Sequence, residues 1–186
     1  NLQAAVDYLN GKDKDENPSV YFTWRLPPAD NLEKSIEQRL ISEILVQNDG
    51  SPLTKAIINS GLITDVSPYN GINGGTVFSS FTIGMDGVKK GNVSKLQKLI
   101  LKTINNLVKK GINQDDIDCA VMDLEISTKE VRRSAGPFSL TLLRRALKGW
   151  TVGRSPSQEL LIQDAFDSVK AKINAYPDYL KSLLKE

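Results

Sequence analysis

The first part of the chain shows two apolar patterns, one typical of a strand and one typical of a helix. Ser19–Leu26 is rich in β-forming residues and stops at two prolines, and its alternation places Val20, Phe22 and Trp24 on one face. From Leu32 to Leu45, apolar residues recur three or four positions apart after a residue that can cap a helix. This spacing predicts a helix with one buried stripe.

A second helix and two further β-segments are predicted next. Ser51-Pro52 is a favoured helix start, with serine as the cap and proline in the first turn, and Gly61 suits the helix end. Residues 62–87 hold two β-candidates around a loop at 69–75 that is rich in asparagine and glycine. These glycines match neither phosphate-binding pattern, GxxxxGK[ST] or GxGxxG, so a connecting turn is predicted.

The C-terminal half is predicted to be helical. Each segment carries apolar residues at helical spacing, and one of them presents Leu140, Leu143, Leu147 and Trp150. The predicted helices start near Asn92, Asn113, Pro137, Ser155 and Pro177. A strand, two helices, a strand pair and then several helices indicate an α+β domain with an antiparallel sheet.

The two ends of the chain bear on its domain organisation. Asn1–Asn17 is polar after its first few positions, which is typical of a solvated linker, and we interpret 1–18 as a linker or the start of the domain. Residues 19–186 are then predicted to form one α+β domain. The chain begins without a leader-like segment and its last residues resemble an interrupted helix, so we expect a fragment of a longer chain.

The composition excludes several kinds of catalytic site. The 186 residues include no histidine and one cysteine, Cys119, which we expect to be buried or half-buried. Without histidine, the chain cannot supply a Ser-His-Asp triad, a Cys-His pair or a histidine-based zinc site. The acidic cluster at Asp115, Asp116 and Asp118 is better explained by the first turn of a helix, where carboxylates are stabilised. No catalytic, cofactor-binding or metal-ligating residue is therefore assigned.

Charge and hydropathy point away from nucleic acid and membrane partners. The chain has 24 basic and 22 acidic residues, and no apolar stretch approaches the roughly 20 residues that span a bilayer. We expect a protein that does not span a membrane. Basic pairs occur at Lys89-Lys90, Lys109-Lys110, Arg132-Arg133 and Arg144-Arg145. The last pair is the best candidate for contact with an acidic partner or a peptide carboxylate, because it lies beside Trp150 in an otherwise apolar helix, although ordinary surface is favoured.

Four segments carry a resemblance that covers nearly the whole chain, from about Ser19 onward. They are Ser51–Leu62, Phe81–Val88, Gly136–Leu140 and Ala146–Trp150. In order and spacing these segments resemble motifs of the presequence proteases, which belong to the pitrilysin/insulinase-type zinc metallopeptidases. The first is similar to the pattern SPL-x-KAL-x-ESGL of that family, and the second to its F-x-(I/V)-G-(L)-x-G-(I/V) strand.

The resemblance implies a LuxS/processing-peptidase-like metallopeptidase fold, in which helices pack on one face of an antiparallel sheet. Such proteases consist of four related domains in two halves that enclose a peptide-degrading chamber. The chain resembles the second, non-catalytic domain. The inverted His-x-x-Glu-His motif lies in the first domain, so zinc is implied for the catalytic domain of the parent protein and not for this chain.

The resemblance implies a structural, chamber-forming role in a protease that degrades unfolded peptides. The expected partners are the other domains of the parent protein and its peptide substrates, with no nucleic acid and no membrane. Inter-domain packing would explain Trp24, Tyr69 or Trp150 if any of them is exposed. Two alternatives stay open: a non-catalytic homologue that acts as a scaffold or peptide-binding partner, and a small binding module that uses its basic helix faces.

Overall fold

The computed structural model describes residues 3–7, 18–74, 78–130 and 137–185. Its strands are β1 (Gln3–Asp7), β2 (Ser19–Arg25), β3 (Asp65–Val66), β4 (Gly71–Asn73) and β5 (Ser80–Asp86). Its α-helices are α1 (Leu32–Val46), α2 (Pro52–Asn59), α3 (Val93–Lys110), α4 (Gln114–Lys129), α5 (Phe138–Thr151), α6 (Ile162–Ala175) and α7 (Tyr179–Leu183). Two short 3-10 helices are η1 (Lys90–Asn92) and η2 (Gln158–Leu160).

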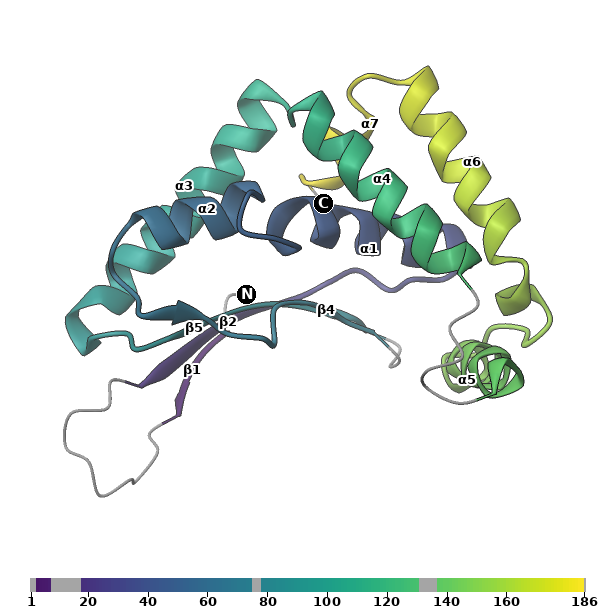
Figure 1. Ribbon diagram of the computed structural model, residues 1–186, viewed down its shortest axis with the longest axis horizontal. Helices are drawn as coiled ribbons and strands as arrows, with labels where there is room; N and C mark the ends of the chain where they lie inside the picture. Colours follow the sequence, from purple (N-terminus) through teal and green to yellow (C-terminus); the bar gives the residue numbers. More distant parts are fainter. Residues whose placement is uncertain (1–2, 8–17, 75–77, 131–136, 186) are drawn as a thin grey trace.

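The strands form one antiparallel sheet with β2 and β5 at its centre. The order is β1-β2-β5-β3, and β4 pairs with β5 as well, next to β3 along the same edge. Phe22 lies opposite Ile83 in the central pair. Figure 1 shows α1, α2, α3 and α4 on one side of this sheet. The α+β fold expected from the sequence is therefore confirmed, with helices packed on one sheet face.

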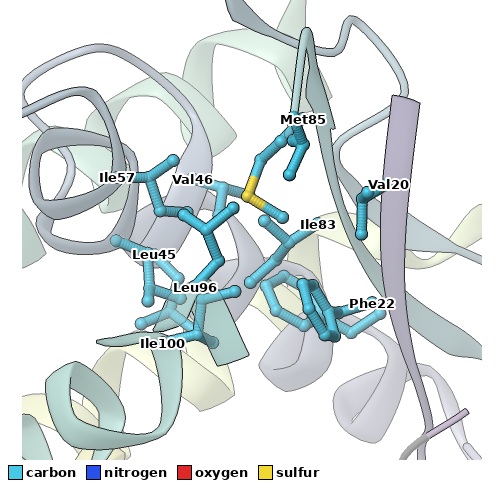
Figure 2. Close-up of a cluster of buried hydrophobic side chains, with 12 residues drawn as sticks. Val20, Phe22, Leu45, Val46, Ile57, Ile83, Met85, Leu96 and Ile100 are labelled. Carbon is cyan, nitrogen blue, oxygen red and sulfur yellow. The ribbon is translucent and has the colours of Figure 1, made fainter. Parts of the chain in front are cut away.

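The first hydrophobic cluster lies between the sheet and α1, α2 and α3 (Figure 2). Val20 and Phe22 of β2 are almost fully buried, which confirms the predicted alternation. Trp24 is only partly buried, and its ring lies 5.9 Å from that of Phe81. The cluster consists of Val20, Phe22, Leu45, Val46, Leu53, Ile57, Phe81, Ile83, Met85, Val88, Leu96 and Ile100. Every second residue of the strands and the apolar stripes of the helices thus face each other and form one hydrophobic layer between the sheet and the helices.

A second cluster lies on the other side of α1, where α4, α6 and α7 cover it. Its buried members are Ile36, Leu40, Ile44, Ala120, Leu124, Phe166, Val169 and Leu180. Ile41 of α1 is partly buried and packs against both clusters. Helix α1 is consequently the element that joins the sheet-bearing and the all-helical parts of the molecule.

The sheet face opposite the helices carries polar side chains. The hydroxyl groups of Tyr21 and Ser67 lie 3.2 Å apart, and those of Thr23 and Thr82 lie 3.1 Å apart. Gly84 allows the Tyr21 ring to approach the backbone, since a Cβ at this position would lie 2.5 Å from Tyr21 Cε1. These contacts give this face an ordered polar surface.

Most helix ends follow the sequence signals, but the Ser51 hydroxyl accepts a hydrogen bond from the Asn48 amide and makes no side-chain cap on α2. Asn31 caps α1, because its Oδ1 accepts a hydrogen bond from the Lys34 amide at 2.9 Å. Gly61 and Gly111 have positive φ values of 63° and 89° just after α2 and α3. Asn113 caps α4, because its Oδ1 accepts a hydrogen bond from the Asp115 amide at 3.4 Å.

Four segments differ from the prediction or refine it. Gly71–Asn73 was expected in a turn but forms β4, which pairs antiparallel with Ser80–Thr82 of β5. The helix expected from Ser155 begins only at Ile162, after a turn and η2. Cys119 is exposed, since the buried side of α4 falls on Ala120 and Leu124. Gln3–Asp7, in the segment left open between linker and domain start, forms β1.

Candidate functional site

A cavity of about 330 Å³ opens between α1, α4, α5 and the ends of β4 and β5. We refer to it as the basic pocket. Its charged lining residues are Arg39, Arg144, Arg145, Lys148, Arg154 and Glu159. Five of these six side chains are cationic, in a chain whose overall net charge is only +2. The pocket therefore concentrates positive charge locally.

Arg154 and Glu159 form a buried ion pair at one wall of the pocket. Arg154 Nε donates to Glu159 Oε1 at 2.5 Å and its Nη2 donates to Oε2 at 3.2 Å, a bidentate arrangement. The Arg154 Nη1 also donates to the carbonyl of Ala29 at 2.6 Å and to Ser35 Oγ at 3.1 Å. The two side chains are 11% and 4% exposed. Among the described residues that line the pocket, the only carboxylate is thus already engaged.

Gly149 of α5 makes room for this ion pair. It is buried, and a Cβ at this position would lie 2.0 Å from Glu159 Cγ. No side chain fits in that space, so the absence of a Cβ allows η2 to pack directly on α5. The turn that replaces the predicted start of α6 is held by these contacts.

Lys148 of α5 also lines the pocket. Its Nζ would lie 3.4 Å from a Cβ on Gly74, so the ammonium lies close to the loop after β4. Although much of the Lys148 side chain is exposed, desolvation lowers its pKa from the ordinary value, and the charges of Arg39 and Arg154 lower it further. Only Glu159 acts in the opposite direction. The positive charges of Lys148, Arg39 and Arg154 therefore act on one another, and the negative charge of Glu159 offsets them only in part.

The remaining basic residues differ in how they are paired. Arg39 lies 3.5 Å from Glu43 and donates to Ser127 Oγ at 3.0 Å. The side chains of Arg144, Arg145 and Lys148 make no hydrogen bond or ion pair with any residue that the structure describes. Three cations on α5 are therefore available to an anion.

Apolar side chains form much of the rest of the lining. They are Leu32, Ile36, Ile72, Leu124, Val152 and Ile162. A pocket with a cationic side and an apolar side suits a ligand that carries an anionic group next to an apolar one. The sequence favoured ordinary surface for Arg144 and Arg145, and their place in this pocket became visible only in the folded chain.

Helix α5 lies apart from the other helices, beyond the end of β4 (Figure 1). It packs mainly on η2. The apolar positions that predicted this helix are exposed, between 37% for Leu140 and 66% for Trp150. Within the described residues, the apolar side of α5 therefore has no neighbour that buries it.

The other candidates from the sequence do not come together in a site. Asp115 and Asp116 lie in the first turn of α4, as expected from the helix dipole. The pairs Lys89-Lys90 and Lys109-Lys110 are exposed, and Arg132-Arg133 lies outside the described residues. In the part of the chain that the structure describes, no group of three or more Cys, Asp or Glu side chains is placed to hold a metal ion. None of the helices described is long and apolar enough to cross a membrane.

The charge of Lys148 gives a stability prediction. Because burial and neighbouring cations lower its pKa, protonated Lys148 destabilises the folded state at neutral pH. Lys148→Met is expected to raise the melting temperature at pH 7. The gain should shrink as the pH rises through the lowered pKa, since the neutral amine no longer carries the penalty. Thermal unfolding of both proteins between pH 6 and pH 10 measures this, and a lower melting temperature of the variant at pH 7 would contradict it.

Comparisons with known proteins agree on one family. The family model described as "Peptidase M16 inactive domain" matches residues 2–124. The presequence protease of Xenopus laevis is 31% identical over 185 residues, which cover 100% of this chain and 18% of that protein. The mouse presequence protease is 29% identical over 168 residues, covering 90% of this chain and 16% of that protein. The chain thus spans less than a fifth of the length of these relatives.

A solved structure shows the same fold. The inactive peptidase domain of a putative zinc protease from Bordetella parapertussis aligns with a TM-score of 0.70 at 14% identity, covering 95% of this chain and 88% of that one. The ferredoxin protease FusC, solved in complex with Arabidopsis ferredoxin, aligns with a TM-score of 0.63 at 12% identity, covering 89% of this chain and 17% of that one. Because the family model matches well over half of the residues, the chain belongs to the family of peptidase M16 inactive domains.

Proposed function

We propose that this chain is a structural, chamber-forming domain of a zinc-dependent metalloendopeptidase that degrades unfolded peptides. The match to an inactive peptidase domain carries this proposal, together with the small share of the presequence proteases that the chain spans. Zinc and the reacting groups would belong to another domain of the parent protein, because this chain has no histidine. The chain itself would supply structure and no catalysis.

The two faces of the sheet differ in a way that supports a role as a chamber wall. One face is covered by helices, and the other presents the ordered polar contacts of Tyr21, Thr23 and Thr82. A polar, helix-free face can border a solvent-filled space. Tyr69 is 76% exposed and Trp150 is 66% exposed, which supports packing of this domain against its neighbours in the parent protein.

We also propose that residues 19–186 fold as one domain. The family model ends at residue 124, within α4. Helices α6 and α7 nevertheless pack on α1 through the second hydrophobic cluster. A boundary near residue 124 would divide that cluster, which supports a domain that continues to the C-terminus.

The second candidate is a non-catalytic homologue that acts as a scaffold or peptide-binding partner. The basic pocket favours it, because cations that have no acidic partner among the described residues lie beside apolar walls, and this combination suits a peptide ligand. In this case the protein that contains the chain would lack the His-x-x-Glu-His motif altogether.

Peptide hydrolysis and zinc content test the proposed function. The purified 186-residue chain is expected to hydrolyse no unfolded fluorogenic peptide and to bind no stoichiometric zinc. The parent protein is expected to do both, and deleting residues 19–186 from it should abolish hydrolysis. A parent reading frame without a His-x-x-Glu-His segment would favour the scaffold instead. Peptidase activity of the isolated chain that survives stringent purification would overturn both assignments.

A further inference from the structure

The basic pocket has the chemistry of an anion site whose own acidic groups do not neutralise it. Glu159, the only carboxylate among the described lining residues, is held by Arg154 through two hydrogen bonds. Arg144, Arg145 and Lys148 line the pocket and have no acidic partner among the described residues. Cations held together in this way repel one another, and an entering anion relieves that repulsion.

The apolar lining and the small volume of the pocket restrict the kind of anion that fits it. Ile36, Ile72 and Leu124 lie on its walls, and burying an apolar group against them is favourable. A free phosphate would leave these walls in contact with water. The volume of about 330 Å³ is at the small end for ligand pockets, which suits the end of a peptide better than a large cofactor.

We propose that the basic pocket binds the carboxylate of a peptide together with an adjacent apolar side chain. The carboxylate accepts hydrogen bonds from Arg145 and Lys148, with Arg144 at the rim, while the apolar side chain lies on the walls formed by α1 and α4. The carboxylate can be the C-terminus of the peptide or an Asp or Glu side chain. The proposal concerns binding by this chain alone, so it can fail without affecting the chamber-forming role, and the reverse also holds.

Fluorescence anisotropy with the full 186-residue chain tests this proposal. Three short peptides carry an uncharged N-terminal fluorophore: Ala-Ala-Ala-Leu with a free C-terminus, the same peptide as a C-terminal amide, and Ala-Glu-Ala-Leu as the amide. The peptide with the free C-terminus, the peptide with the glutamate, or both are expected to bind at least about tenfold more tightly than Ala-Ala-Ala-Leu amide. The reason is that the uncharged amide has no carboxylate to accept charge-assisted hydrogen bonds from the pocket. Preference for the first or the third identifies the source of the carboxylate.

Variants separate the pocket from general surface charge. Arg145→Gln and Lys148→Gln are each expected to weaken binding of the preferred peptide by about tenfold. Lys110→Gln removes the same charge from an exposed site outside the pocket and is expected to leave binding unchanged. Equal binding of all three peptides, or an equal loss with Lys110→Gln, would overturn the proposal. So would inorganic phosphate binding the chain more tightly than the acidic peptides do.

Discussion

Replacing Glu159 with alanine is expected to lower the free energy of unfolding by about 3–5 kcal/mol. The substitution would leave the Arg154 guanidinium buried, at 11% exposure, without its anionic partner. The Ala29 carbonyl and Ser35 hydroxyl would still accept from it, but neither carries a compensating charge. Urea denaturation followed by circular dichroism measures the loss.

A double-mutant cycle isolates the ion pair from the packing around it. Arg154→Met and Glu159→Leu should each cost about as much as Glu159→Ala, whereas the double variant Arg154→Met/Glu159→Leu should be less damaging than either of its single changes, because no buried charge is left alone. Asp178→Ala serves as the control, since its ion pair with Lys181 involves a carboxylate that is 86% exposed. Additive losses in the double variant would contradict a role for the ion pair.

Replacing Phe166 with alanine is expected to lower the free energy of unfolding by about 3–5 kcal/mol as well. Phe166 of α6 is 2% exposed and lies in the second cluster against α1 and α4. Its removal leaves a cavity between helices that the close-packed surroundings can fill only in part. Leu143→Ala in α5 is the matched control, because Leu143 is 52% exposed and its truncation should change stability little.

The Phe166 variant also tests the proposed single domain. If residues 19–186 form one cooperative unit, the β-sheet and the helices should unfold at the same urea concentration in the variant, although α6 lies outside the segment that the family model matches. In a Trp150→Phe background, tryptophan fluorescence comes from Trp24 alone and reports on the sheet, while circular dichroism at 222 nm reports on the helices. Two separate transitions would contradict a single domain.

Local sequence patterns predicted most of the secondary structure because the signals lie within a few residues of one another. The alternation of Val20 and Phe22, the Asn31 cap and the glycines after α2 and α3 each have a direct counterpart in the fold. Strand β4 was missed because its three residues are identified only by pairing with β5. The delayed start of α6 was missed because the preceding turn depends on Arg154 and Glu159 packing on α5.

The basic pocket could not be predicted from the sequence for a related reason. Its cations come from α1, α5 and the turn before η2, and they meet only when α5 packs at the end of the sheet. The one available signal was the pair Arg144-Arg145 in an otherwise apolar helix, which is equally typical of exposed surface. The resemblance to presequence proteases identified the family correctly but gave no residue of this pocket.

Glu159 packs directly against Gly149, and this contact limits what truncating substitutions can reveal about the basic pocket. The wall that holds Arg154 depends on a position that has no side chain, since a Cβ there would overlap with Glu159 Cγ. A mutational scan that removes side chains one at a time passes over such a position, because a glycine has none to remove. The pocket therefore depends as much on the absence of a side chain at residue 149 as on its charges, and only substitutions that add atoms there would reveal it.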